Sequence, residues 1–422
     1  MHYALACAER PRTYHPVTRE ARGIAAVCVC ALHLALLAPT VGSWSSILER
    51  DFGPEAEAIE HGDRPYDDQE LEYPPLSIPL IVGPALIGDG IDDYIEAFEW
   101  EMIAFDLAIV LLLALALPGD QRRVLGALGV YTVGIVALSG IALADSIIDQ
   151  APLALARFDL VPALLVLAAV LARDRGRSAG WSALLATGAA VKAFPLLLFP
   201  ALLRGERHRR RVAVAAAIPL LVALAVVVAW GDHFSSAITY QTDRALQVET
   251  IAATPFVVSN MVGAEVHSEF TNGSWNVVAT GADLARAVSL AAMVCLYLVV
   301  LLAGWLRRVD WLPWATALLA AIVVLYPVLS PQFLLWLLPL SAAAYGLGRE
   351  NLVLLAGLVL TELALRHYDD AIGDLHADFI WRIAGRNLLL LVYLFLVCAP
   401  IIRGVDWESA LDWRTWRAAS ST

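Results

Sequence analysis

The feature that most constrains this chain is its succession of apolar runs, each of roughly the 17–25 residues that a helix needs to cross a lipid bilayer. Of the 422 residues, 59% are hydrophobic, whereas soluble domains contain roughly 45–50%. The mean hydropathy is +0.67. We therefore expect an all-α membrane protein that crosses the bilayer many times.

Charge and cysteine content exclude several classes of protein. A net charge of −12 argues against nucleic-acid binding, because phosphate backbones are bound by basic patches. Arginines gather in some loops and acids in others, as they do when arginine-rich loops stay in the cytoplasm. Neither a metal site nor a disulfide framework is predicted by the spacing of the five cysteines, which are Cys7, Cys28, Cys30, Cys295 and Cys398.

The arginine-rich loops determine the expected topology. The N-terminal tail, residues 1–22, should be cytoplasmic and followed by an uncleaved span, because four arginines precede the first apolar run. One membrane domain then covers 23–402 and a cytoplasmic tail covers 403–422. The outer loops are expected at about 42–101, 145–157, 231–283 and 366–386. The expected single spans are Gly23–Val41, Met102–Leu117, Val124–Ala144, Phe158–Leu171, Val212–Trp230, Leu284–Leu306, Trp311–Pro327, Phe333–Gly346, Asn351–Leu365 and Asn387–Ile402.

Two apolar segments do not fit a simple span. Pro74–Gly88 is short and rich in proline, which removes backbone donors and kinks helices. We expect a juxtamembrane or re-entrant helix there, because a full span would place the arginine-rich loops outside. Gly180–Leu203 has arginines on both sides, so two short helices broken near Lys192–Pro195 are expected. The total comes to about twelve membrane helices.

Lys192 is the only lysine in the chain and lies within an apolar run. Placing a cation near the bilayer centre costs roughly 2.5–3.5 kcal/mol, so this residue needs a physical reason. One interpretation is that it binds an anionic ligand, such as a lipid phosphate, at a broken helix. The alternatives are a side chain that reaches to the interface and a structural ion pair.

The loop from Ser43 to Leu76 is conspicuously acidic, with ten carboxylates between Glu49 and Glu72. A carboxylate can take the proton from an acceptor hydroxyl during sugar transfer. Most of these acids must be solvated, because so many like charges in one site would repel one another. The candidates for chemistry are Glu49, Asp51, Asp67, Asp68 and Glu72.

Three further polar motifs interrupt the apolar pattern. Arg157-Phe158-Asp159 stands at the outer end of a span, where it could face a cavity or form an interfacial salt bridge. Within 240–250, Arg244, Gln247 and Glu249 are spaced to share a helix face, or are simply solvated. Ser330-Pro331-Gln332 breaks a hydrophobic hairpin, either to cap the next helix or as a plain turn.

Together these motifs resemble glycosyltransferase family 87, whose members are membrane mannosyltransferases of the GT-C fold. Gly62-x-x-Pro65-Tyr66-x-Asp68 followed by Glu72-Tyr73-Pro74-Pro75-Leu76 is similar to the first-loop signature of that family. The further matches, in order from about Asp51 to Pro339, are Arg157-Phe158-Asp159, Lys192-Ala193-Phe194-Pro195, Tyr240-x3-Arg244-x2-Gln247-x-Glu249 and Ser330-Pro331-Gln332-Phe333-x2-Trp336-Leu337-x-Pro339.

The resemblance implies a GT-C helical bundle whose donor, a polyprenyl-phosphate sugar that is usually mannose, enters from the membrane. It also implies transfer on the extracytoplasmic face, with an acid of the first outer loop as base. Two positions depart from the family's pattern. The expected acid aligns with Leu48, beside Glu49 and Asp51, and Gln241 stands where the family tends to have histidine.

The sequence therefore predicts an inverting glycosyltransferase of the plasma membrane with a glycan or glycolipid acceptor. Asp51 is the expected base, with Glu49 in reserve, and Arg157, Lys192 and Arg244 are expected to neutralise the departing phosphate. No cofactor or metal is expected, although the acids could hold a divalent cation. The expected donor-binding residues are Tyr66, Asp68, Glu72, Tyr73, Arg157, Asp159, Lys192, Tyr240, Arg244, Gln247, Glu249 and Gln332.

Two other functions fit parts of the same pattern. A transporter or flippase of a lipid-linked or anionic solute would also use a broken helix and an intramembrane lysine, although the chain has no visible inverted repeat. A catalytically inactive GT-C homologue would retain the scaffold without the base.

Overall fold

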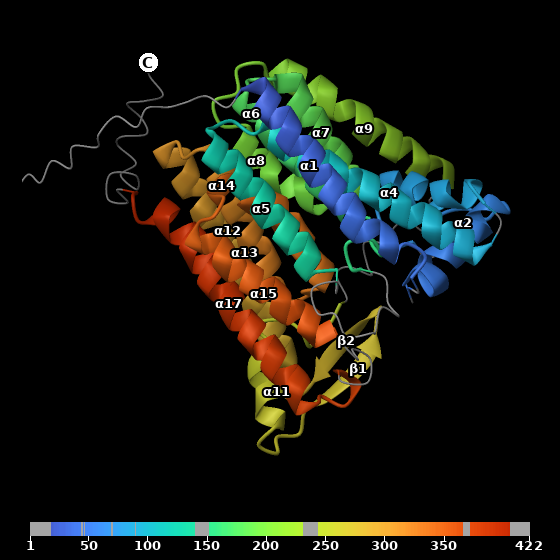
Figure 1. Ribbon diagram of the computed structural model, residues 1–422. Coiled ribbons are helices and arrows are strands. Elements are labelled where there is room, and N and C mark those ends of the chain that lie inside the picture. Colours follow the sequence, from blue (N-terminus) through green and yellow to red (C-terminus); the bar gives the residue numbers. More distant parts are fainter. Residues whose placement is uncertain are drawn as a thin grey trace, which may run out of the picture.

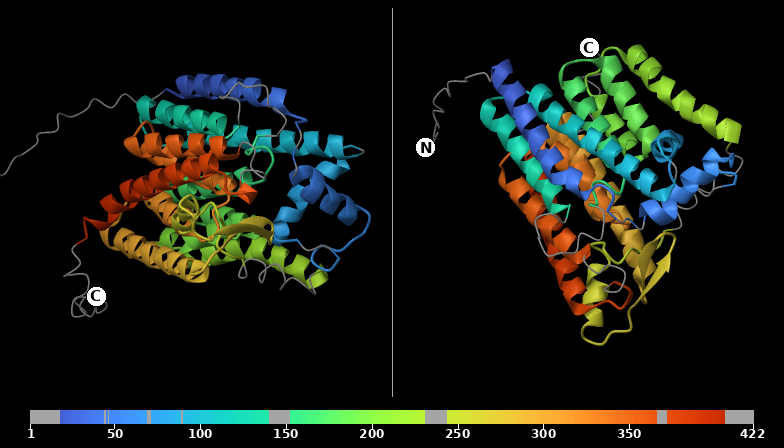
Figure 2. Two further views of the ribbon diagram at one scale, coloured as in Figure 1. Left: turned by 90° about the horizontal axis from the view of Figure 1, so that it is seen from below. Right: turned by 45° about the vertical axis from the view of Figure 1, so that its right-hand side comes forward.

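The structure is a computed structural model that describes residues 18–43, 45, 47–68, 71–88, 90–139, 152–230, 244–365 and 372–405. Helices account for 74% of it, and they form one elongated bundle with a smaller cap at one end (Figures 1 and 2). The described helices of more than ten residues are α1 (Arg19–Leu37), α4 (Ile91–Leu111), α5 (Gln121–Ala137), α6 (Leu160–Asp174), α7 (Ser178–Val191), α9 (Arg209–Trp230), α12 (Ala282–Arg307), α13 (Trp311–Leu325), α14 (Leu334–Tyr345), α15 (Arg349–Leu365) and α17 (Ala377–Ile402).

The centre of the bundle is formed by α13 and α14. Almost every residue of both helices is buried, as expected for helices that are apolar on all sides. Helices α5, α6, α12 and α17 pack around this pair. The main hydrophobic core runs through these contacts and holds the central helices together.

Four of the described helices are long and apolar enough to cross a membrane, by length and composition alone: Arg19–Thr40, Arg209–Ala229, Ala282–Arg307 and Ala377–Ile402. Shorter apolar helices lie at Pro75–Leu86, Ser178–Val191 and Trp311–Leu325. The expectation of many apolar helices is confirmed, whereas the number of about twelve membrane helices is not.

The break predicted near Lys192–Pro195 is present. Helix α7 ends at Val191, and Lys192 has extended backbone angles (φ −154°, ψ 127°). Pro195 then stands near the start of the 3-10 helix η7 (Phe194–Leu198), where its missing N–H costs no hydrogen bond. The helix α8 (Phe199–Leu202) follows. Lys192 therefore lies in the non-helical segment between α7 and η7.

The predicted short helix in Pro74–Gly88 is divided further by its prolines. It consists of η3 (Pro75–Ser77), α3 (Ile78–Val82) and η4 (Gly83–Leu86), each with a proline in its first two positions. A proline there removes no hydrogen bond but ends the preceding piece. Before it lie the π-helical turn η2 (Leu48–Phe52) and α2 (Gly53–Glu60).

Two helices begin earlier in the chain than the spans expected from the sequence. Helix α4 begins at Ile91, within the region 42–101 that was expected to be an outer loop. Its buried Tyr94, Ile95, Phe98 and Met102 follow helical spacing despite the acids between them. Helix α17 likewise begins ten residues before the expected Asn387, at Ala377.

The class all-α also needs a correction, because the segment 231–283 contains strands. β1 (His267–Thr271) pairs antiparallel with β2 (Ser274–Val278). The connecting Asn272 and Gly273 both have positive φ, 50° and 64°, as a tight two-residue hairpin turn requires. Asn272-Gly273 is a dipeptide typical of such turns, whereas the two strands were not expected. A second, smaller core joins the hairpin to α11 (Thr254–Asn260) and the start of α17.

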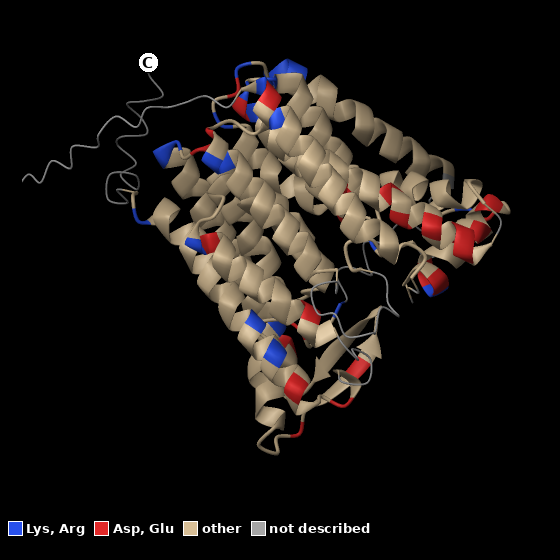
Figure 3. Cartoon of the chain, in the orientation of Figure 1, with Lys and Arg blue, Asp and Glu red and all other residues tan. Residues whose placement is uncertain are grey.

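The two ends of the bundle differ in charge (Figure 3). Acids gather around α2 and the start of α4, while most arginines lie at the opposite end of the bundle. Several of these arginines donate hydrogen bonds to carbonyl groups near helix C-termini, where cations are favoured by the helix dipole. Their acceptors are Leu117 for Arg22, Leu202 for Arg173, Ala343 for Arg123, Gly304 for Arg204 and Pro400 for Arg307.

Candidate active site

The acidic end of the bundle presents Asp51 from a tight turn. The turn η2 buries Leu48 and Phe52 in the core and leaves Asp51 exposed. The turn runs directly into α2, so Asp51 and Glu55 lie one helical turn apart. Gly53 permits this junction, because a Cβ there would lie 2.4 Å from Ile91 Cδ1 and 2.7 Å from the Leu48 carbonyl oxygen. The local sequence therefore places both carboxyl groups on one side.

Arg157 is the cation that faces these acids. It interacts electrostatically with Asp51, Glu72, Tyr73 and Asp159. Its Nη1 donates to the Tyr73 hydroxyl at 3.3 Å, and its guanidinium carbon lies 5.9 Å from the centre of the Phe52 ring. The arginine and the acids thus form one mixed-charge cluster.

The carboxyl groups in this cluster do not have ordinary proton affinities. Burial, together with the negative charges of Asp51 and Glu72, raises the pKa of Glu55 from 4.5 to about 8. Partial desolvation also raises the pKa of Asp51, while Arg157 acts against this shift. Such perturbations are common where a protein arranges groups for acid–base chemistry.

Three buried polar atoms of the cluster have no hydrogen-bond partner among the described residues. They are Glu55 Oε2, Glu72 Oε2 and Arg157 Nε. Each such atom costs about 1–3 kcal/mol when it is left without a partner. Native structures retain few of them, and a bound ligand or water is the usual explanation. The cluster therefore offers buried polar atoms to which a ligand or water can bind.

Lys192 lies beside this cluster in an aromatic cage. Its Nζ donates to Asp159 Oδ1 at 2.8 Å, and the same oxygen accepts from Trp336 Nε1 at 2.5 Å. The ammonium lies 5.3–5.6 Å from the ring centres of Tyr73, Phe158, Phe333 and Trp336, within the range of cation–π attraction. The ion pair considered from the sequence is therefore present.

Tyr73 connects the two parts of the site. Its hydroxyl contacts Arg157, while its ring stands 5.4 Å from the Lys192 ammonium. Tyr66 holds the backbone in place, because its hydroxyl donates to the Tyr73 carbonyl at 2.6 Å. Tyr66 itself has φ 71°, an uncommon conformation for a residue with a side chain.

Comparison with protein families then decides the class of protein. The model of glycosyltransferase family 87 matches residues 72–331, which is more than half of the chain. This chain belongs to glycosyltransferase family 87. The match includes Glu72, Tyr73, Arg157 and Lys192, and thus most of the cluster. A search of curated proteins finds no significant match. With its long apolar helices, the protein is a membrane glycosyltransferase.

The structure of this family 87 member brings together only part of the predicted site. Asp51, Glu72, Tyr73, Arg157, Asp159 and Lys192 meet, with Tyr66 as support. Glu49 is exposed and is not among the charges that act on Arg157. The exposed Asp68 accepts from the Arg64 backbone N–H at 2.8 Å and closes its own loop.

Gln332 is buried in the 3-10 helix η8 (Pro331–Phe333), directly before the Phe333 ring of the lysine cage. Tyr240 lies outside the described residues.

The prediction that Arg244, Gln247 and Glu249 share a helix face was wrong. The segment is not helical, and Gln247 pairs with Asn276 in an isolated β-bridge. The Arg244 carbonyl accepts from Arg286 Nη1 at 3.3 Å. A turn and strand-like backbone replace the expected helix because the hairpin provides the hydrogen-bond partners.

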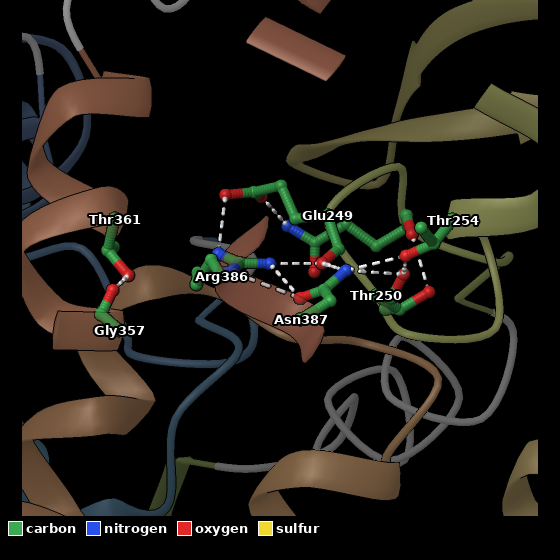
Figure 4. A network of polar contacts seen from close by, with 8 residues as sticks. Glu249, Thr250, Thr254, Gly357, Thr361, Arg386 and Asn387 are labelled. Carbon is green, nitrogen blue, oxygen red and sulfur yellow. Dashed lines mark hydrogen bonds and ion pairs between the residues drawn. The ribbon is translucent and has the colours of Figure 1, made fainter. Parts of the chain in front are cut away.

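Gln247 and Glu249 instead take part in a buried network with Arg386 and Asn387 of α17. Figure 4 shows Glu249 beside these two residues. Gln247 Nε2 donates to Glu249 Oε2 at 2.6 Å, and Glu249 Oε1 lies 4.0 Å from Arg386 Nη1. Asn387 Nδ2 donates to the Thr250 carbonyl and to Thr254 Oγ1. This network joins the segment 247–254, which packs beside the β1–β2 hairpin, to helix α17.

Glu55 is the functional candidate that the sequence interpretation missed. The available signal was its spacing, four residues after Asp51, which places both acids on one helix face. Trp336 was noted only as a motif residue, although its indole N–H holds Asp159. Nothing in the local sequence shows that Asp159 and Trp336, which are far apart in the chain, would meet.

Proposed function

We propose that this enzyme is an inverting glycosyltransferase that moves mannose from a polyprenyl-phosphate donor to a glycan or glycolipid acceptor. The observation that carries this proposal is the cluster of Asp51, Glu55 and Glu72 around Arg157, in which buried polar atoms have no hydrogen-bond partner among the described residues. A cation beside carboxyl groups suits a reaction with an anionic leaving group and a hydroxyl acceptor.

In the proposed mechanism, Asp51 is the general base. Its carboxylate takes the proton of the acceptor hydroxyl while the acceptor oxygen bonds to the anomeric carbon and the bond to the phosphate oxygen breaks. The exposed position of Asp51 gives an acceptor access to it. Glu49 remains the reserve base, in the same turn η2.

Arg157 is proposed to stabilise the departing polyprenyl phosphate. A phosphate leaving group needs charge stabilisation more than protonation, and Arg157 Nε is buried without a hydrogen-bond partner among the described residues. Lys192 adds positive charge nearby, although Asp159 compensates much of it. Arg244 is proposed to assist. With these cations the proposed step uses no metal ion.

The other motif residues remain proposed parts of the donor site. Tyr66, Glu72 and Tyr73 would shape the sugar pocket, as their position beside Arg157 supports. The remaining members of the proposed set are Asp68, Asp159, Tyr240, Gln247, Glu249 and Gln332.

We also propose the GT-C fold and the orientation that it implies. About twelve helices would lie in the plasma membrane, with the acidic end outside and both termini in the cytoplasm. The separation of charge in Figure 3 supports this orientation, because arginine-rich ends favour the cytoplasm.

A transfer assay tests the proposal. Membranes that contain the enzyme would be incubated with labelled polyprenyl-phosphate mannose, with polyprenyl-phosphate glucose and with nucleotide sugars. We expect transfer of label from a polyprenyl-phosphate sugar to a membrane glycan or glycolipid. Transfer from nucleotide sugars alone, under conditions that block formation of the lipid-linked donor, would overturn the proposed donor class.

A further inference from the structure

Glu55 has no role in the mechanism above, yet it lies within the site. It stands on α2 one turn after Asp51, half-buried. Its Oε2 is buried and has no hydrogen-bond partner among the described residues. A carboxyl oxygen in this position is costly unless a ligand or a proton satisfies it.

The charged and titratable groups around Glu55 come from four parts of the chain. Asp51 precedes it in η2, Glu72 comes from the segment before η3, and Arg157 comes from the segment before α6. The fourth part is α4, where burial and then the charge of Glu55 raise the pKa of Tyr94. Helix α3 and η4 pack against α2 as well, but their sequences, IPLIV and GPAL, contain no titratable residue.

These surroundings favour the neutral form of Glu55. Burial and two nearby carboxylates outweigh the single arginine and raise the pKa of Glu55 to about 8. A carboxyl group with this pKa is mostly protonated at pH 7. A neutral carboxylic acid can donate a hydrogen bond, whereas a carboxylate can only accept.

A phosphate ester presents mainly acceptor oxygens, so its site must supply donors. Arg157 Nε is one buried donor without a hydrogen-bond partner among the described residues. An ionised Glu55 next to the phosphate would repel it. A protonated Glu55 would add a second hydrogen-bond donor without adding negative charge to the site.

We propose that Glu55 binds the donor as a neutral carboxylic acid, donating a hydrogen bond to a phosphate oxygen beside Arg157 while Asp51 takes the acceptor proton. The inference rests on the proposed function. Glu55 retains its proton throughout. The acceptor oxygen bonds to the anomeric carbon, the bond from that carbon to the phosphate oxygen breaks, and the acceptor proton moves to Asp51.

The test compares Glu55→Gln, Glu55→Ala and Asp51→Asn with the wild-type full-length enzyme. Glu57→Gln is the matched control, because Glu57 is an exposed acid on the same helix. Transfer rates from polyprenyl-phosphate mannose would be measured from pH 6 to 9, and binding of polyprenyl phosphate would be measured separately by thermal shift.

We expect the wild-type and Glu57→Gln rates to fall as pH rises through about 8, because Glu55 then loses its proton. Glu55→Gln retains a donor that cannot ionise, so its rate at pH 7 should fall only several-fold and its alkaline decline should disappear. Glu55→Ala should lose about 100-fold, as expected when one donor to a developing charge is removed.

Two results would overturn the inference. In the first, Glu55→Gln is as inactive as Asp51→Asn at pH 7, which would make Glu55 a base. In the second, Glu55→Gln retains the wild-type alkaline decline. Either result leaves the proposed function standing if the wild type transfers sugar. A wild type that neither transfers the sugar nor is stabilised by polyprenyl phosphate would remove both proposals.

Discussion

At the scale of single residues, the two cations of the site differ in what holds them. Arg157 has a buried nitrogen without a hydrogen-bond partner among the described residues, whereas the Lys192 ammonium is bound by Asp159 and surrounded by aromatic rings. Lys192 is the single lysine in a chain rich in arginine. A compact ammonium fits this cage, while a planar guanidinium has a different shape and donor geometry.

This difference gives a prediction for the Lys192–Asp159 pair. Lys192→Met and Asp159→Asn should each destabilise the protein, by about 3 kcal/mol, because each leaves one buried charge uncompensated. The double variant should be more stable than the sum of the two effects implies. Thermal unfolding in detergent measures the cycle. Additive effects would show that the pair does not interact in solution.

Lys192→Arg is the control for charge alone. It retains the positive charge but not the shape, so it should not restore wild-type stability. A fully stable Lys192→Arg protein would show that the cage does not select an ammonium.

At the scale of elements, local chemistry determined which features could be predicted. The break after Val191 was predictable because a proline and a charge interrupt an apolar run within a few residues. The hairpin turn was predictable from Asn272-Gly273. The start of α4 was not, because acids between Tyr94, Ile95, Phe98 and Met102 hide a buried helical face.

Contacts between distant residues limited the prediction of the site. The Arg386–Glu249 contact joins residues 137 positions apart, and no local pattern indicates such a pair. The same holds for Trp336 and Asp159, which are 177 positions apart. Most residues of the site could therefore be predicted from motifs, but their contact partners could not. Gln247 and Glu249 lie in the network with α17 and not on the helix face that was expected.

The junction between η2 and α2 provides a test at this scale. Gly53→Ala should distort the turn that presents Asp51, because the new Cβ would meet Ile91 and the Leu48 carbonyl. We expect a lower melting temperature and a transfer rate reduced at least tenfold, since small displacements of catalytic groups have large effects. Gly62→Ala is unsuitable as a control, since Gly62 has φ 110°.

Gly83→Ala is the better comparison, because nothing lies within 4 Å of a Cβ built at Gly83 and its φ is not positive. It should leave both stability and transfer close to the wild type. Equal losses in the Gly53 and Gly83 variants would contradict a specific role for the junction.

At the scale of the whole molecule, charge is sorted between two ends. Arginines at one end bind carbonyl groups near helix C-termini, while the site and its acids lie at the other end (Figure 3). This separation agrees with a proposed reaction site on one face of the membrane and an arginine-rich surface on the other.

Orientation can be tested by cysteine labelling in a background without native cysteines. Glu57→Cys, at the acidic end, should react with a membrane-impermeant maleimide in intact cells. Arg210→Cys, at the start of α9, should react only after permeabilisation. The reverse pattern would contradict the proposed topology and would place the site in the cytoplasm.

If Asp51 is the base that transfers sugar from a lipid phosphate, its removal should abolish most of the activity of the purified enzyme. Purified wild-type, Asp51→Asn and Glu57→Gln proteins would be compared for transfer from polyprenyl-phosphate mannose at pH 7. We predict transfer by the wild type and Glu57→Gln, and a loss of about 100- to 10,000-fold in Asp51→Asn, because a general base is removed. Undiminished transfer by Asp51→Asn would contradict the account.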